Sequence, residues 1–495
     1  MKKRNKILEF LKNNWYFVLL VIPFVFFSIR NKTPDNDIWF LMNNGRYVIN
    51  NGIPHIDPFT IHEGLHYVMQ QWLSYVIFYS IYNTFGKHGL WGLMIFIYLV
   101  LVVVLYNINK YISKNKFYSV IVEVIVMSML CDYLVTRPQV FSYIILLLET
   151  YCLEKYYQED NWKYLIFLPI LSVLLINMHS AIWFLQYVFM LPFIVNILVK
   201  DKNKWKRIGT IGVVLIIMFI VGFINPYGIE AITYLFKSYG IKDVNHSIME
   251  MIPSNIEYPV WFLSILLFLL YVYVAIYHRK KKVEIRYFLF LIGTFILALL
   301  HKKCISYYLL WYSYAAMGLY FKIDIFKKMK NNKYYISIKN GLIVGLSLSL
   351  LVILGLTIKT SYSVYSMRDR NEEVIDYLLD NYDVEDIKLY ASFNDGGYAE
   401  YRNIKVYMDP RAELFFKKMN GKYDIFSESY TVENYPTDEE IEDFLSKYHF
   451  THLMVYFDTT LEKYLKNSDK YQCIYTKYFD DDKSLPLVLL YVNKE

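Results

Sequence analysis

The sequence predicts a polytopic α-helical membrane protein that ends in a small α/β domain. Of its 495 residues, 56% are hydrophobic, and they gather in runs that short basic loops separate. Water-soluble domains rarely reach this fraction, and such runs are typical of membrane spans. Residues 1–360 carry a net charge of +18, whereas residues 361–495 carry −11. We therefore expect a transmembrane domain at 1–360 and a soluble α/β domain at 361–495.

The first apolar run, 15–29, follows the basic start "MKKRNK". A basic segment followed by an apolar run is also how a signal peptide begins. The residues after it, "FFSIRNKTPD", are bulky and charged, so they do not form a small-residue cleavage site. We interpret the run as a retained first span. About ten more spans are predicted, at 89–106, 117–134, 138–154, 164–178, 181–199, 207–224, 258–277, 286–300, 304–321 and 338–359.

The basic connections predict how the chain threads the membrane. With eleven spans, the five most basic segments fall on one side, which the positive-inside rule assigns to the cytoplasm. This requires "MQQWLSYVIFYSIYNTF", residues 69–85, to be an interfacial or re-entrant helix. If it were a span, the later basic loops would face outward, and we reject that alternative. The N-terminus is then cytoplasmic, while the first loop (30–88) and the C-terminal domain are extracytoplasmic.

The C-terminal segment alternates strand-like and helix-like patterns. The runs "IKLYAS", "IKVYMD", "HLMVYF", "YQCIYTKY" and "LVLLYV" are β-branched and aromatic, and "DEEIEDFLSKY" has helical spacing. Within this segment "NDGGY", residues 394–398, predicts a turn between strands, with a ligand loop as the alternative. The four cysteines are scattered and match neither a disulfide framework nor a metal spacing. Since the basic excess belongs to membrane loops, we expect no nucleic-acid partner.

Two acids lie directly after the first span, in "TPDNDIWF". Asp35 and Asp37 would point to one side of an extended loop, but would diverge by about 200° on a helix. Together with Asp57, they could bind a divalent cation such as Mg²⁺ or Mn²⁺ through oxygen ligands. One of them could instead take a proton as a general base. The structural alternative is that Asp35 or Asp37 caps the helix beginning "IWFLMNNG".

The order of short motifs carries a resemblance to a known class. An acidic motif after the first span is followed by an amphipathic interfacial helix and by "HIDPF", and a second helix opens with "QQWL". Then come "TRPQVFSYI", "NMHSAIW", "INPYGIE" and "MDPRAEL". This order resembles the GT-C class of membrane glycosyltransferases, which includes protein O-mannosyltransferases, aminoarabinose transferases and the oligosaccharyltransferase catalytic subunit. It is most similar to a bacterial group within that class. The chain departs from the class pattern at Ile38, where an acidic residue often follows.

The resemblance implies a GT-C-like fold in a bacterial plasma membrane and a sugar donor on a polyprenyl-phosphate carrier. Asp37 is similar to the catalytic aspartate of the class, with Asp35 in support. The acceptor would be an extracytoplasmic glycan, lipid or protein. A flippase for polyprenyl-linked glycans and a non-catalytic scaffold for envelope assembly are the alternatives. Internal repeats and charges in mid-span, which a transporter would show, are not evident in the sequence.

Further polar residues on the predicted outer face are candidates for the site. Arg137 could pair with a donor phosphate or extend to lipid headgroups. His301, Lys302 and Lys303 are cations on the face that the positive-inside rule leaves poor in charge, so phosphate or anionic lipid are their predicted partners. The other candidates are His55, His179, Glu250 and the pair Asp409 and Arg411, for which a turn residue, solvent exposure or a local ion pair is the structural alternative.

Overall fold

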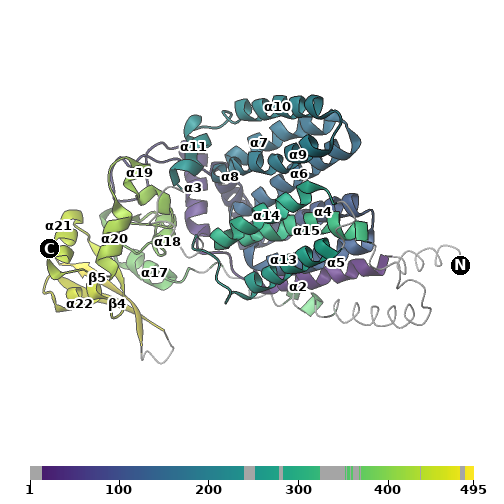
Figure 1. Cartoon of the computed structure of the whole chain (residues 1–495). Coiled ribbons are helices and arrows are strands. Elements are labelled where there is room, and N and C mark those ends of the chain that lie inside the picture. Colours follow the sequence, from purple (N-terminus) through teal and green to yellow (C-terminus); the bar gives the residue numbers. More distant parts are fainter. Residues whose placement is uncertain are drawn as a thin grey trace. The chain divides into compact units, whose positions relative to one another are not determined.

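The computed structural model describes residues 14–238, 251–277, 283–323, 369–434, 436–479 and 485–494, with a few single positions between 352 and 367 (Figure 1). The chain forms two compact units. The helical unit comprises Met1–Pro34, Lys87–Gly228 and Asn245–Ser366, and the mixed unit comprises Asp35–Gly86, Ile229–Val244 and Met367–Glu495. The predicted first outer loop therefore packs with the C-terminal segment.

The helical unit consists of helices that follow the predicted apolar runs. Its α14 packs against α15 and α9, and α6 packs against α7. The predicted run 338–359 lies almost wholly outside the described residues. The helices are η1 Trp15–Leu20, α2 Val21–Arg30, α5 Lys116–Leu130, η2 Cys131–Tyr133, α6 Gln139–Glu159, η3 Trp162–Ile166, α7 Phe167–Met178, α8 Ser180–Trp183, α9 Leu185–Lys200, α10 Lys204–Val221, α13 Pro259–Tyr277, α14 Ile285–Leu300, η4 Lys302–Cys304 and α15 Ile305–Ile323, with the second part of α4 Trp72–Ser113.

Exposed apolar side chains identify the helical unit as membrane-embedded. Val213, Ile216 and Ile220 follow one face of α10, Tyr273 and Ile276 follow one face of α13, and each is 58–65% exposed. Contiguous apolar surface of this kind is unstable in water and is typical of a lipid-facing surface. By length and apolar composition alone, three described helical segments are sufficient to cross a bilayer: Trp72–Ser113, Ser180–Lys200 and Pro259–Tyr277. The total of about eleven spans stays a prediction.

The long helix α4 is broken at Gly86. Its φ of 63° and ψ of −156° are not helical, so the element is two helices joined end to end. Glycine adopts this conformation without the steric penalty that a Cβ would bring. The first helix belongs to the mixed unit and the second to the helical unit. The break lies between the predicted interfacial segment 69–85 and the predicted span 89–106.

A five-stranded sheet organises the C-terminal part of the mixed unit. The strand order is β2-β1-β3-β5-β4; β1 pairs in parallel with β2 and β3, and β5 pairs antiparallel with β3 and β4. All five strand-like runs of the sequence are found as strands. They are β1 Lys388–Tyr390, β2 Lys405–Val406, β3 His452–Tyr456, β4 Tyr471–Tyr478 and β5 Pro486–Asn493.

Short helices surround the sheet, and their ends follow local sequence signals. Thr437 and Glu440 form a reciprocal capping box at the start of α21, which fixes that boundary. Leu389 and Leu453 on neighbouring strands are fully buried, so the sheet contributes to the core. The helices are α17 Glu372–Asn381, η6 Val384–Asp386, α18 Gly396–Tyr401, η7 Ala412–Phe415, α19 Lys417–Asn420, α20 Ile425–Asn434, α21 Asp438–Tyr448 and α22 Thr460–Asn467, joined by α3 Ile38–Asn51 and α11 Ile229–Ser238 from earlier in the chain.

The first outer loop covers the β2 edge of this sheet. Thr60 forms a parallel bridge with Val406, and the Ile61 amide donates to the Val406 carbonyl oxygen at 2.9 Å. The Nε2 atom of His62 lies 2.8 Å from the Tyr407 carbonyl oxygen. An uncovered strand edge exposes backbone groups that would otherwise pair with another chain. The loop satisfies these groups, which explains why it packs with the C-terminal segment.

Candidate functional site

The acidic loop, residues 35–37, turns directly into α3. The Asp37 amide donates to Oδ1 of Asp35 at 3.1 Å, and the Ile38 amide donates to the Asp35 carbonyl oxygen at 3.0 Å. Asp37 occupies the N-cap position, but its side chain makes no capping hydrogen bond. The capping alternative therefore does not account for the Asp37 carboxylate, whereas Asp35 has a local structural role.

Asp57, one of the predicted cation ligands, has protein donors at both carboxylate oxygens. Its Oδ1 atom lies 2.6 Å from Nη1 of Arg411, and its Oδ2 atom accepts hydrogen bonds from the Thr60 amide and hydroxyl at 3.0 and 2.7 Å. Both carboxylate oxygens are thus engaged by protein donors. Within the described part of the chain, no group of three or more His, Cys, Asp or Glu side chains could hold a metal ion. These donors do not fit a Mg²⁺ or Mn²⁺ site, and we derive no step through a metal.

Arg411 is the centre of a buried ion cluster in which Asp57, Glu400 and Asp409 surround one guanidinium. Its Nη2 atom lies 2.6 Å from Oδ2 of Asp409 and 3.1 Å from Oε1 of Glu400, while its Nε donates to Oδ1 of Asp409 at 2.9 Å. The Arg411 side chain is 5% exposed and the three carboxyls are fully buried. Three of the residues selected from the sequence thus belong to one cluster.

The protonation of this cluster follows from its charges. Burial, and then the neighbouring Asp409 carboxylate, raise the pKa of Glu400 well above its usual range. Arg411 lowers the pKa of Asp409 below its usual value despite the burial that opposes it. Glu400 therefore holds a proton more readily than Asp409, although both lie beside the same guanidinium. Its role was missed in the sequence because a single glutamate in "GGYAEY" carries no signal that it is buried.

A second group of predicted site residues lies where three helices of the helical unit begin. The Ser142 hydroxyl of α6 lies 2.8 Å from Nδ1 of His179, which directly precedes α8. At the start of α6, Gln139 donates to the Ser306 hydroxyl of α15 at 3.4 Å, and that hydroxyl donates to the Lys303 carbonyl oxygen at 2.8 Å. Burial, and then the nearby Lys303 ammonium, lower the pKa of His179 to about 3.

The starts of α6, α8 and α15 form what we call the helix-start cluster, whose candidate residues are the cations Arg137 and Lys303 and the imidazole of His179. Arg137 belongs to it because its carbonyl oxygen accepts the Val140 amide in the first turn of α6. Helix starts present amide groups and a partial positive charge, which favour anions. The cluster therefore combines side-chain and backbone features that suit a phosphate.

The other outer-face candidates have different surroundings. The Lys302 ammonium lies over the Tyr258 ring, 3.6 Å from its centroid, and Nδ1 of His301 lies 2.8 Å from the Met251 carbonyl oxygen. Both side chains thus contact the segment 251–258. His55 is exposed at the surface of the mixed unit. Glu250 lies outside the described residues.

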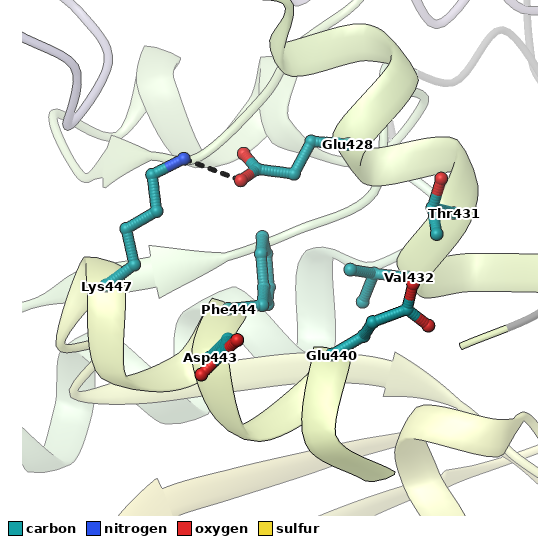
Figure 2. A pocket seen from close by; sticks show the side chains of 7 residues that line it. All are labelled: Glu428, Thr431, Val432, Glu440, Asp443, Phe444 and Lys447. Carbon is teal, nitrogen blue, oxygen red and sulfur yellow. Dashed lines mark hydrogen bonds and ion pairs between the residues drawn. The ribbon is translucent and has the colours of Figure 1, made fainter. Parts of the chain in front are cut away.

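A groove of about 280 Å³ lies between α20 and α21, and none of the predicted site residues lines it (Figure 2). Figure 2 shows Glu428 directed toward Lys447, with which it forms an ion pair at 2.6 Å. Glu440 is engaged in the capping box with Thr437. Two of the three acids around this groove therefore have structural partners.

Comparison with known proteins gives a fold likeness. No protein-family model matches the chain, and no curated protein does. The apo oligosaccharyltransferase of Archaeoglobus fulgidus is 12% identical, with a TM-score of 0.58 over 90% of this chain and 70% of that chain. The oligosaccharyltransferase AglB of the same organism, in complex with an inhibitory peptide and a dolichol-phosphate, is 11% identical with a TM-score of 0.59 over the same shares. The chain therefore has the fold of these oligosaccharyltransferases, and the resemblance to the GT-C class predicted from its sequence is confirmed at the level of the fold.

Proposed function

We propose that this protein is a membrane glycosyltransferase that moves a sugar from a polyprenyl-phosphate carrier to an extracytoplasmic acceptor. The observation that carries the proposal is the place of Asp37, an acid directly after the first predicted span and at the N-cap position of α3. The fold likeness supports it, since one of the similar structures holds a dolichol-phosphate and a peptide. We place the protein in a bacterial plasma membrane with the mixed unit outside the cytoplasm.

In the proposed reaction the acceptor attacks the anomeric carbon of the sugar in a single displacement. The bond from that carbon to the acceptor forms while its bond to the carrier phosphate oxygen breaks. Asp37 takes the proton that the acceptor loses, and Arg137 and Lys303 stabilise the charge that develops on the leaving phosphate. Lys302 and His301 are not needed for this role, because the 251–258 segment already engages them.

Asp37→Asn tests the proposal, because it removes the proton acceptor while retaining size and polarity. The full chain in lipid nanodiscs would be supplied with lipid-linked sugars extracted from membranes of the source cells, and transfer would be measured by radiolabel. General-base catalysis contributes about 10²–10⁴ in rate, so transfer should fall by about two orders of magnitude or more. Melting should change little, because asparagine retains the size of the side chain and an oxygen that accepts hydrogen bonds.

Asp35→Asn is the matched control, because its amide oxygen can still accept the Asp37 backbone hydrogen bond. Its loss of transfer should be much smaller. Transfer at the wild-type rate by well-folded Asp37→Asn protein would exclude Asp37 as the base. Wild-type protein that moves the lipid-linked sugar between leaflets without transferring it would instead establish a flippase.

A further inference from the structure

The turn predicted at "NDGGY" leads directly into α18, which begins at Gly396, and we refer to residues 394–397 as the turn. It contacts the acidic loop, although more than 350 residues separate them in sequence. The Asn36 side-chain amide donates to the Asn394 carbonyl oxygen at 2.9 Å. Gly397 faces the first turn of α3: a Cβ built on it would lie 3.6 Å from the Phe40 amide nitrogen. The turn thus contacts the acidic loop at Asn36 and the first turn of α3 at Phe40, on either side of Asp37 in sequence.

Asp395 holds this turn rigidly. Its carboxylate is 2% exposed and accepts hydrogen bonds from Nε of Arg370 at 2.7 Å, from the side-chain Nδ2 of Asn371 at 2.6 Å and from the Tyr456 hydroxyl at 3.1 Å. The Ser392 hydroxyl donates to it as well. A buried carboxylate with this many donors is costly to displace, so the backbone next to it has little freedom.

The two glycines allow the turn to lie this close to its neighbours. A Cβ on Gly396 would lie 1.9 Å from the Met408 carbonyl oxygen, so a larger residue would force the turn away from the segment after β2. A Cβ on Gly397 would make ordinary contacts at 3.5 Å or more with Pro410 and Phe40. Gly396 is therefore required by packing, whereas position 397 has room for one methyl group.

The helix that follows the turn continues the contact with α3. The Trp39 ring lies against the rings of Tyr398 and Tyr401, with centroids 4.8 and 5.2 Å apart. Arg46 donates to the Tyr401 carbonyl oxygen at 2.9 Å and to the Asn403 side-chain oxygen at 2.8 Å. Contacts at Trp39 and Arg46 thus fix α3 against α18 and the residues after it. The hydrogen bond of Asn36 fixes the acidic loop against the turn before α18.

We propose that the turn 394–397 positions the acidic loop, and that the bond from Asn36 to Asn394 sets the direction in which Asp37 points. Asn36 lies between the two acids, so fastening its side chain restricts the backbone rotations of both neighbours. Asn36 is a positioning residue that itself takes no proton. The catalytic consequence rests on the proposed function, since displacing a reacting group by about 1 Å can lower the rate 10²-fold.

Asn36→Ala tests this inference, with Asn381→Ala as the matched control. Asn381 also donates an exposed side-chain bond to a carbonyl oxygen, that of Tyr377 at 2.7 Å, but within α17. For Asn36→Ala, hydrogen–deuterium exchange of the amides at 37–41 should rise at least tenfold while exchange in the sheet stays unchanged. The kcat for transfer should fall about 10- to 100-fold with an unchanged KM for the donor.

A second pair of variants probes the same contact from the turn. Gly397→Ala should match the wild type, whereas Gly397→Val, which adds bulk toward Phe40, should reproduce the exchange and kcat changes of Asn36→Ala. Exchange in Asn36→Ala that equals that of Asn381→Ala would overturn the inference. So would raised exchange with an unchanged kcat, because the loop would then be loosened without consequence. Wild-type protein without transfer activity would refute the proposed function, while the exchange comparison would still decide whether the turn holds the loop.

Discussion

Replacing Arg411 by methionine removes the guanidinium around which three buried carboxyls gather, while retaining a side chain of similar length. In the wild type, Arg411 lies 2.6 Å from both Asp57 and Asp409 and 3.1 Å from Glu400. The variant therefore leaves the buried carboxyls of Asp57 and Asp409 without their cation. Removing one partner of a buried ion pair costs about 3–5 kcal/mol. That is a large part of the 5–15 kcal/mol by which a typical domain is stable.

The assay is thermal unfolding of the full chain in detergent micelles, followed by the near-UV signal of the tyrosine-rich mixed unit. Arg402→Met is the matched control: Arg402 pairs with Asp376, and their side chains are 34% and 44% exposed. An exposed pair contributes about 0–1 kcal/mol, so Arg402→Met should melt within a few degrees of the wild type. A triple variant, Arg411→Met with Asp57→Asn and Asp409→Asn, should recover part of the loss, since it leaves no unpaired charge.

The destabilisation by Arg411→Met should also depend on pH, and the lowered pKa of Asp409 determines the direction of that dependence. Arg411 lowers the pKa of Asp409 in the fold, so this interaction contributes stability above the ordinary pKa of 3.8 and is lost as the pH falls through the lower folded value. The difference between wild type and Arg411→Met should therefore shrink below about pH 4. Equal destabilisation by Arg411→Met and Arg402→Met would refute the reasoning, as would a difference that persists fully in acid.

The remaining predictions concern one buried acid and the helix-start cluster. Burial raises the pKa of Asp369 to about 6, so the wild type loses stability as the pH rises from 3.8 through 6. Asp369→Asn should then be more stable above pH 6, by at most about 3 kcal/mol, with no gain at pH 3.5; the same gain at both pH values would contradict this. Lys303→Gln should weaken binding of a polyprenyl-phosphate analogue at least fivefold in nanodiscs, whereas Lys302→Gln should not, because its ammonium lies on the Tyr258 ring. Equal weakening by both variants would contradict the assignment of the phosphate to Lys303 in preference to Lys302.

Several features of the site were beyond prediction because they depend on contacts between distant segments. Asp57 and Arg411 were both selected as candidates, but the 354 residues between them hide their pairing. The sequence likewise could not distinguish Lys303, which lies near His179, from Lys302. The two are adjacent lysines, and only the folded backbone determines where each side chain points. The sequence also left open whether the Asp35 or the Asp37 side chain stabilises the backbone before α3. In the structure it is Asp35, which accepts a hydrogen bond from the Asp37 amide.

The sequence by itself determined the helical character of the first part of the chain, the five strands of the last part and the resemblance in fold. The helical character and the strands follow from local periodicity, which is set by residues close in sequence that share one helix face or one side of a strand, whereas the resemblance rests on the order of short motifs. The tertiary structure alone decided that the first loop completes the β2 edge, that Arg411 gathers three carboxyls and that "NDGGY" lies against the acidic loop. Hydropathy and charge report which solvent a segment prefers and not which polar segment it meets. Two polar segments pair only where backbone donors, acceptors and buried charges match in space, and that match appears only in the folded chain.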